Sequence, residues 1–542
     1  MTALRTRVLA AAVAIVLTAA CSKPTQTNAP SAPANGILRV ANWAEPNSLN
    51  PLLISNTAEN FIASLIFDEL VTIDDKGNDV PDLAAQVPTL RNRGISPDGR
   101  TITYKLRRNV RWHDGVPFTS ADVKFSWQAV MNPNNNVVER RGYDQVSSVD
   151  TPDGYTVVFH LKQPFSPFID TVFGESDDPF RIIPKHVLGS LPNINKAAFN
   201  SAPIGTGPFK FVRWVHGDHV QLAANDDYFR GKPRLRGIVV QTVVEDNTKT
   251  AMLRSHGTDL IVALSAAAYR ILRGNPNVRI LFIRAPSYTS IDFNFTRPPL
   301  NDLRVRKAIA HTIDNKRIVT NLTYGTARVA TADLSDFYWA FDPSLAPVAY
   351  DLSQANALLD AAGWKRGANG VRAKNGTPLS LQLVYGQGSE TARQIAVQVQ
   401  SDLAQAGISV LLKPYLYNML YATQQEGGVL SNGRFDLAEW SWVAGADPDD
   451  SSQWMCDQIP PKGNNNGHYC NPQVDAAERD ALSTFDRAKR KAQYAVTQSL
   501  LLKDAAASFI YYPRLRYAMN PALQNFRPNG PSEGWNAYQW SF

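Results

Sequence analysis

The sequence predicts an α/β protein built from two or three compact units. Short strand patterns alternate with helical patterns along almost the whole chain, and no internal repeat is evident. About 520 residues follow the N-terminal leader, which is enough chain for two or three domains of ordinary size. Beyond the leader, no apolar run approaches the length that spans a bilayer.

The first 35 residues predict export. Two arginines precede an apolar run of 13 residues, Val8 to Ala20, which is too short to span a bilayer and is followed by Cys21. This order resembles a bacterial lipoprotein signal, in which residues 1–20 are the signal peptide and Cys21 becomes the lipidated first residue. Thr18 stands where such signals usually have leucine, so plain secretion and an uncleaved anchor remain as alternatives. The polar, proline-broken stretch 21–35 is expected to be a flexible tether.

The strands are predicted from buried apolar runs or from alternation of apolar and polar residues. Alternation with a period of two places successive side chains on opposite faces of a sheet. In chain order we expect strands at Ile37 to Ala41, Thr101 to Leu106, Tyr155 to Leu161 and Ile408 to Leu412.

The helices are predicted from apolar residues at helical spacing and from their end signals. In chain order we expect helices at Phe61 to Leu70, Thr119 to Ala129, Leu303 to Ile318 and Thr391 to Ala406. Ser120 is the expected N-cap of the second helix, with the carboxylate of Asp122 in its first turn, and Gly407 ends the fourth.

The charge pattern argues against a nucleic-acid partner. A formal net charge of +7 is spread over 542 residues. The basic cluster of Arg107, Arg108 and Arg111 alternates with apolar residues as in a strand, so we interpret it as a solvated face.

The three cysteines predict one disulfide. Once Cys21 is assigned to the lipid, Cys456 and Cys470 remain, and an even pair in an oxidising compartment favours a bond between them. The segment between them is rich in proline, glycine and asparagine, so it can turn back on itself. A zinc site that also uses His468 is the alternative, but no fourth ligand stands at finger spacing, and we expect no metal or other cofactor.

No catalytic constellation is predicted. Gly530 to Gly534 (GPSEG) has the form of a nucleophile elbow, but the required histidine would have to follow it, and the last histidine is His468. His216 and His219 stand at an expected hairpin turn, without the H-E-x-x-H helix of zinc enzymes. His113 has no catalytic partner spaced with it and is expected to be structural.

Seven motifs follow one another along nearly the whole chain after the leader. The longest is SPDGRTITYKLRRNVRWHDGVPFTSADVKFS, residues 96–126. The others are GTGPFKFVRW (205–214), NDDYFRGKP (225–233), DFNFTRPPLNDLRVRKAIAHTIDNKRI (292–318), ANALLDAAGW (355–364), AGADPD (444–449) and NPQVD (471–475). In this order they resemble the substrate-binding proteins of peptide- and nickel-type ABC importers, solute-binding protein family 5.

The resemblance implies a two-lobed, periplasmic-binding-protein-like clam-shell with mixed sheets and a discontinuous first lobe. The implied division is 36–80, 200–290 and 512–542 for lobe I, 81–199 for a subdomain of lobe I, and 291–511 for lobe II. The chain is expected to cross between the lobes near Ser290 to Phe295 and near Ile510 to Arg514, and hinge motion there would close the lobes on a ligand.

The same resemblance implies an extracytoplasmic solute-binding protein without catalytic activity. It would capture oligopeptides by hinge closure and deliver them to the membrane permease subunits of an ABC importer. We expect a monomer that is exported to the periplasm or cell surface and held to the membrane by its lipid. The alternatives are a non-peptide solute such as a metal chelate, haem or a sugar, a receptor that signals without transport, or a secreted hydrolase.

The candidate ligand-binding residues lie around one loop. In many peptide-binding relatives, an aspartate shortly after a tryptophan holds the free amine of the peptide. Here the chain reads Trp440, Ser441, Trp442, and alignment on Asp447 puts Ala444 at the position of that aspartate. A buried ammonium without a carboxylate partner is costly. Either Asp447 supplies the charge, or the ligand is not a free-amine peptide.

Further candidates come from strand ends and from charge. We expect Trp442 and Trp43 in the cleft because each follows a strand end, where binding loops leave such sheets, and Trp440 beside them. Arg434 is a candidate partner for a ligand carboxylate, with an exposed turn arginine as the alternative. For any single aromatic residue here, core packing is the competing interpretation.

Overall fold

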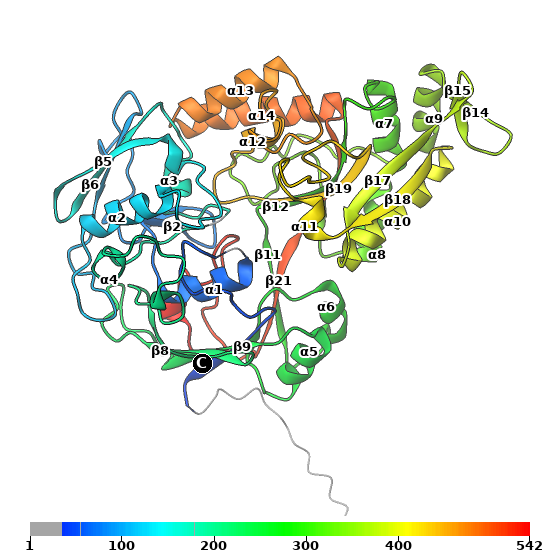
Figure 1. The fold of residues 1–542 in the computed structure, drawn as a ribbon. Helices are drawn as coiled ribbons and strands as arrows, with labels where there is room; N and C mark the ends of the chain where they lie inside the picture. Colours follow the sequence, from blue (N-terminus) through cyan, green and yellow to red (C-terminus); the bar gives the residue numbers. More distant parts are fainter. Residues whose placement is uncertain (1–34, 55, 178) are drawn as a thin grey trace, which may run out of the picture.

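The computed structural model describes residues 35–54, 56–177 and 179–542. It has two lobes, each built around a mixed sheet, and a smaller three-stranded sheet beside the first lobe (Figure 1). The expected signal peptide, Cys21 and all but the last residue of the expected tether lie outside the described residues. Across the described ranges, none of the helices combines the length and apolar character that a membrane crossing requires.

The first lobe contains a seven-stranded sheet that collects strands from three separate stretches of the chain. Its order is β11-β21-β10-β1-β9-β8-β7; β1 runs parallel to β9 and β10, and the other neighbours are antiparallel. The strands are β1 (Ile37–Asn42), β7 (Phe209–Val215), β8 (His219–Ala224), β9 (Gly237–Thr242), β10 (Leu260–Ile261), β11 (Arg279–Arg284) and β21 (Arg514–Met519). The helices are α1 (Thr57–Ile66), α5 (Asp246–Arg254) and α6 (Ala266–Leu272).

A smaller body is inserted between α1 and β7. Its antiparallel sheet has the order β4-β6-β5, and α2 packs against it. The elements are β2 (Val71–Ile73), β3 (Asp79–Pro81), β4 (Thr101–Lys105), α2 (Ser120–Met131), β5 (Val146–Asp153), β6 (Thr156–Leu161), α3 (Phe168–Thr171) and α4 (Lys185–Leu188), with 3₁₀ turns at Tyr143–Gln145 and Ala198–Asn200. A third 3₁₀ turn, Ala537–Gln539, lies outside this body, near the C-terminus of the chain. One continuous apolar core joins this body to the seven-stranded sheet, so the two belong to one lobe.

The second lobe is built on a six-stranded sheet with the order β13-β20-β12-β19-β17-β18. Its strands are β12 (Ser287–Phe293), β13 (Arg328–Val329), β17 (Ser380–Gly386), β18 (Ser409–Tyr415), β19 (Leu437–Val443) and β20 (Ala507–Tyr512), and a small sheet holds β14 (Lys365–Arg366), β15 (Arg372–Lys374) and β16 (Thr377–Pro378). Alternate residues of β17 and β19 enter two different cores, so both faces of the sheet are covered.

The helices of the second lobe divide between the two faces of its sheet. One core includes residues of α7 (Leu303–Thr312), α8 (Asn315–Leu322), α9 (Leu352–Ala361) and α10 (Glu390–Gln405). The other includes residues of α11 (Tyr417–Leu420), α12 (Ser451–Trp454), α13 (Pro472–Ser483) and α14 (Arg487–Asp504). Figure 1 shows α13 and α14 reaching along the second lobe to the inserted body of the first.

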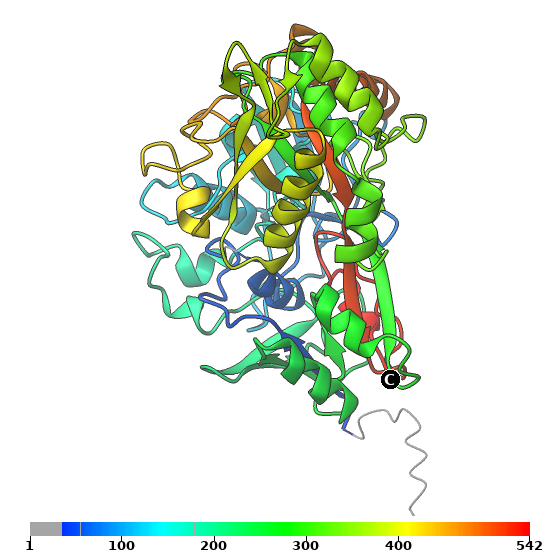
Figure 2. The ribbon, with the colours of Figure 1, turned by 90° about the vertical axis from the view of Figure 1, so that its right-hand side faces the viewer.

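Two extended segments carry the chain between the lobes. Only Ala285 and Pro286 separate β11 from β12, and only Pro513 separates β20 from β21. Figure 2 shows these two segments, green and red, side by side between the lobes. The first crossing precedes the expected stretch Ser290 to Phe295, because most of that stretch already pairs with β19 and β20. The second falls within Ile510 to Arg514, as expected. The predicted α/β clam-shell with a discontinuous first lobe is confirmed.

The predicted helices differ from the structure mainly at their ends. The spacing from Leu303 to Ile318 predicts one helix, but the helix breaks at Ile313 because the side chain of Asp314 caps a new one, accepting a hydrogen bond from the Arg317 nitrogen at 3.0 Å. In α2, Thr119 rather than Ser120 is the N-cap, and it forms a capping box with Asp122.

The predicted helix Phe61 to Leu70 is α1, which starts and ends four residues earlier. It starts early because the Asn56 side chain accepts a hydrogen bond from the Glu59 nitrogen at 3.1 Å. At its other end, the backbone of Gly207 donates to the carbonyl of Ile66 at 2.8 Å, and a Cβ atom at Gly207 would lie within 2.6 Å of that carbonyl. This close crossing of two backbones accompanies the end of the helix.

Candidate functional site

The carboxyl ends of parallel strands define the candidate binding region. In the first lobe these are the ends of β1, β9 and β10, and in the second lobe the ends of β17, β18 and β19. Ligands of open α/β sheets bind outside such ends, where the connecting loops leave. Residues 444–450, which come directly after β19 and contain the sequence-predicted Asp447, form the 444–450 loop.

Exposed apolar side chains gather at these strand ends. Trp43 after β1 and Val244 after β9 are 37% and 67% exposed, and Tyr417 after β18 and Val443 at the end of β19 are 70% and 56% exposed. Large exposed apolar groups commonly mark a binding surface. Of these residues only Trp43 is predicted from the sequence; the signal for the others is their position at the last residue of a strand or two residues beyond it.

Trp440 and Trp442 lie on β19 and stack at 6.3 Å between ring centroids with an interplanar angle of 13°. Tyr421 contacts Trp440 at 5.5 Å and Tyr417 contacts Tyr421 at 4.4 Å, so four rings form a row that starts at the exposed Tyr417. Trp440 is largely buried in the core, whereas Trp442 is half-buried and lines a small pocket with Ala444. Both indole N–H groups are buried and have no hydrogen-bond acceptor among the described residues.

Asp447 is already paired inside the second lobe. Arg490 on α14 donates to both of its carboxylate oxygens, at 2.6 and 2.7 Å, and the Asp449 backbone nitrogen donates to it at 3.0 Å. The two side chains are 6% and 8% exposed. Burial alone would lower the pKa of Arg490, but Asp447 and Tyr494 raise it well above its usual value, so the guanidinium stays charged.

Asp449 joins the two lobes. Its carboxylate accepts a hydrogen bond from Arg141 of the inserted body at 2.5 Å and one from the Ser451 nitrogen at 3.0 Å. Burial is the largest single effect on the pKa of Asp449 and acts to raise it, but the Arg141 guanidinium, the hydrogen bonds from Ser451 and the charge of Arg490 together lower it. Beside this pair, the Ala446 nitrogen donates to the Glu175 carbonyl at 2.7 Å. The pocket enclosed by these contacts measures about 30 Å³, room for one or two water molecules.

Asp450 and Asp333 line the same small pocket, and both residues are 2% exposed. Burial, and after it the neighbouring Asp333, raise the pKa of Asp450 well above its usual value, which favours its neutral form. The indole N–H of Trp454 donates to one carboxyl oxygen of Asp450 at 3.0 Å.

A larger groove lies beside Arg490, between the inserted body and the second lobe. It measures about 420 Å³, and its walls include Leu90 and Asp170 on one side and Trp339 and Arg487 on the other. Asp170 also lines the small pocket at the 444–450 loop. This volume is in the range of small-molecule sites.

Arg434 is engaged within its own loop. Its guanidinium donates to the carbonyls of Gly427 and Gly428, and the side chain is exposed. The structure therefore gives Arg434 a role in closing the loop that precedes β19.

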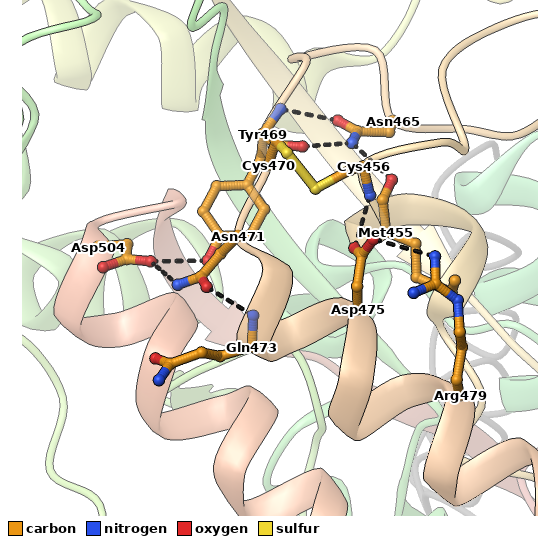
Figure 3. The surroundings of a disulfide bond; sticks show 10 residues. All are labelled: Met455, Cys456, Asn465, Tyr469, Cys470, Asn471, Gln473, Asp475, Arg479 and Asp504. Atoms are coloured by element: carbon orange, nitrogen blue, oxygen red, sulfur yellow. Dashed lines mark hydrogen bonds and ion pairs between the residues drawn. A yellow bond between two sulfur atoms is a disulfide. The ribbon is translucent and has the colours of Figure 1, made fainter.

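The disulfide between Cys456 and Cys470 is present, with Cα atoms 4.4 Å apart (Figure 3). The Cys456 nitrogen donates to Asp475 of α13 at 2.8 Å, and the Asn465 amide donates to the carbonyls of Met455 and Tyr469 at 3.0 and 2.7 Å. Since Cys456 follows α12, the bond and these hydrogen bonds anchor the chain just beyond the 444–450 loop. In the part of the chain that the structure describes, no group of three or more histidine, cysteine and carboxylate side chains is arranged to hold a metal ion.

The other motifs have structural roles. His113 accepts a hydrogen bond from the Gly205 nitrogen at 3.2 Å and bonds the Gly207 carbonyl at 3.0 Å, and burial lowers its pKa to about 4, so it is neutral and structural as expected. His216 lies in the turn of the hairpin formed by β7 and β8, and His219 begins β8. Gly530 to Gly534 is irregular backbone, without the strand and helix of a nucleophile elbow.

Sequence reasoning missed Arg490, Arg141 and Asp333. Arg490 had a local signal: it stands four residues before the buried Tyr494, on the buried stripe of α14 that also holds Leu501. A basic residue on such a stripe requires a buried partner. Arg141 and Asp333 had no comparable signal, because each meets the 444–450 loop from a distant part of the chain.

Comparisons with known proteins agree with this architecture. The family described as bacterial extracellular solute-binding proteins, family 5 (middle part) matches residues 80–463. The chain is 29% identical over 511 residues to the oligopeptide-binding protein AppA of Bacillus subtilis, covering 93% of this chain and 91% of AppA. It is 32% identical over 448 residues to a putative ABC transporter peptide-binding protein of Brucella ovis, covering 79% and 78% of the two chains.

Two solved structures have the same fold. NikZ of Campylobacter jejuni in complex with Ni(L-His) is 26% identical, with a TM-score of 0.77 over 94% of this chain and 100% of NikZ. AppA of Bacillus subtilis in complex with a nonapeptide is 27% identical, with a TM-score of 0.75 over 93% of this chain and 98% of AppA. The chain therefore belongs to the bacterial extracellular solute-binding proteins of family 5.

Proposed function

We propose that this protein is the solute-binding component of an ABC importer and that its ligands are oligopeptides. It captures a peptide between the lobes by hinge closure and delivers it to the permease subunits in the membrane. The single observation that carries the proposal is that Trp43, Val244, Tyr417 and Val443 are exposed apolar side chains at the carboxyl ends of strands from both lobes. Closure about the short crossings at Pro286 and Pro513 would bury these groups against a ligand.

The proposal also includes the attachment of the protein to the membrane and the division of the chain into lobes. Lipidation at Cys21 would hold a monomer at the membrane surface, with residues 21–35 as the tether and residues 1–20 removed. The expected lobe boundaries at 290/291 and 511/512 move to the crossings: we propose 36–80, 200–286 and 513–542 for lobe I with its subdomain 81–199, and 287–512 for lobe II, because β12 and β20 belong to the sheet of lobe II. In the proposed function, the protein binds and releases its ligand without changing it chemically.

A second candidate is a non-peptide solute such as a metal chelate. The observation in its favour is Ala444, which leaves the 444–450 loop without a carboxylate at the position where peptide-binding relatives hold the amine. NikZ, which shares the fold, was solved with a nickel–histidine complex. Trp442 beside Ala444 suits a planar or apolar ligand as well as a peptide.

Native mass spectrometry of the freshly purified protein tests the proposal. We expect adducts whose masses and fragmentation correspond to peptides of several residues. Adducts with the isotope pattern of a metal, or with the mass of haem or of a sugar, would favour the second candidate. Release of cleaved products from a peptide library would contradict a binding protein and favour a hydrolase.

A further inference from the structure

A further pocket lies wholly within the second lobe. It measures about 350 Å³, which is in the range of small-molecule sites. Its walls come from α7, from the end of α14, from the first residues of β20, and from residues 346–349 of the connection between β13 and α9. Figure 1 shows α7 on the side of the second lobe that faces away from the seven-stranded sheet of the first lobe.

This pocket is separate from the region between the lobes. Ser508, which lines it, pairs with Ile291 of β12, and Ile291 pairs with Glu439 near the start of β19. The 444–450 loop leaves from the opposite, carboxyl end of β19. Every residue that lines the pocket belongs to the second lobe, so a rotation of the lobes leaves its walls in place.

Buried apolar side chains line most of the pocket. Ala310 of α7, Ala505 just after α14, and Ala507 and Phe509 of β20 are 3% to 6% exposed. Three of these four residues are alanines, whose small side chains leave open a space that a protein core ordinarily fills. The aliphatic body of a ligand would bury apolar surface against this floor.

Residues 342–351 form a strap over this floor, and both ends of the strap are held. The Asp342 nitrogen donates to the side-chain oxygen of Gln498 at 3.1 Å, and His311 Nδ1 donates to the Ala349 carbonyl at 2.9 Å. Between these ends, the backbone of residues 345–348 has no hydrogen-bond partner among the described residues. The middle of the strap can therefore adjust to a ligand without losing a hydrogen bond.

Two polar groups of the pocket have no partner in the described part of the chain. Ser508 is 3% exposed, and its hydroxyl has no hydrogen-bond partner there. Lys307 of α7 is half-buried and forms neither an ion pair nor a hydrogen bond there. None of the described residues that line the pocket is an aspartate or a glutamate. A ligand with one negative charge that accepts hydrogen bonds would satisfy both groups.

We propose that this pocket is a second ligand site and that it binds a monocarboxylic acid with an aliphatic body. The carboxylate accepts hydrogen bonds from the Lys307 ammonium and the Ser508 hydroxyl. The aliphatic chain lies against Ala310 and Phe509, beneath the strap. This inference is independent of which solute the protein captures between its lobes.

The probe for the test is octanoate, added to the purified wild-type protein. Calorimetry should show one octanoate bound per chain, and octylamine, which has the same chain length and a positive charge, should bind at least tenfold more weakly. Hydrogen–deuterium exchange should show that octanoate slows amide exchange in the strap. Absence of octanoate binding, or equal affinity for octylamine, would overturn the inference. Protection confined to the 444–450 loop would also overturn it and would leave the proposed function intact.

Two variants test the assignment of the pocket. Lys307→Gln removes the positive charge and should weaken octanoate binding about tenfold. Lys316→Gln is the matched control, because Lys316 is an exposed lysine of α8 outside the pocket, and it should leave the affinity within twofold. Val348 lines the pocket from the strap, so Val348→Trp should fill part of the space and abolish binding. Wild-type affinity in either Lys307→Gln or Val348→Trp, with unchanged circular dichroism, would overturn the assignment.

Discussion

At the scale of single residues, buried charge in the second lobe is balanced pair by pair. Arg490 is placed on the buried face of α14 and meets Asp447 from the 444–450 loop. The pair fixes the loop to the helix, while the indole N–H of Trp454 holds Asp450 at the end of the loop. Removing one member of a buried ion pair costs far more than the intact pair contributes, because the other charge remains buried.

Asp447→Asn should therefore destabilise the protein by about 3 kcal/mol, since Arg490 is left buried without its anion. Urea unfolding followed by tryptophan fluorescence measures the change. Arg479→Gln is the control. The Arg479 side chain is 56% exposed in its ion pair with Asp475, so loss of this pair should lower the free energy of unfolding by less than about 1 kcal/mol. Equal effects of the two substitutions would contradict the assigned role of the Asp447–Arg490 pair.

At the scale of elements, the 444–450 loop is held in place by the helices on its C-terminal side. The loop leads into α12, and the disulfide then ties the end of α12 to the start of α13. At the other end of α13, Ser166 of the inserted body donates from its hydroxyl and its nitrogen to the carbonyls of Ala481 and Leu482, both at 2.8 Å. The last carbonyls of a helix need such partners, and here the other lobe supplies them.

Replacement of both Cys456 and Cys470 by serine should lower the free energy of unfolding by about 3 kcal/mol, because the disulfide closes a loop of about 15 residues. Denaturant unfolding of the variant and of the oxidised wild type measures the difference. Intact mass of the wild type before and after alkylation provides the control for the bond itself. Two alkylated thiols in oxidising buffer would contradict the disulfide.

At the scale of the whole molecule, the lobes meet directly on one side of the hinge. Arg141 and Asp449 pair across the interface, and Ser166 caps α13 from the opposite lobe. The two crossings at Pro286 and Pro513 are short and extended, so a rotation there separates or joins these contacts together. A contact between the lobes whose strength differs between the open and the closed state shifts the population of these states and so changes the apparent ligand affinity.

Arg141→Gln should weaken ligand binding by about fivefold, because the lost ion pair is partly solvated, with 31% of the arginine side chain exposed, and contributes about 1 kcal/mol to closure. Calorimetry with a peptide identified by mass spectrometry measures the affinity. Small-angle X-ray scattering without ligand should show a larger radius of gyration for Arg141→Gln than for the wild type. Lys162→Gln, an exposed position on the same body, is the control. Unchanged affinity and scattering in Arg141→Gln would contradict a closing role.

Features that depend on the local order of residues were predictable from the amino-acid sequence alone. The α/β class follows from the alternation of strand and helix patterns, and the seven motifs identify the family. The pairing of Cys456 with Cys470 follows from parity and a turn-rich segment. These signals lie within short stretches, so they are readable without knowledge of the fold.

The residues that balance the charges of the 444–450 loop could not be predicted, because they reach the loop through tertiary contacts. Asp447 meets Arg490 across 43 positions of sequence, and Asp449 meets Arg141 across 308. From the sequence, Asp447 is a candidate partner for a ligand amine, and its actual partner depends on where α14 packs. The charge that a ligand can bring to a site depends on which protein charges already balance each other there, and that balance is set by contacts between distant segments.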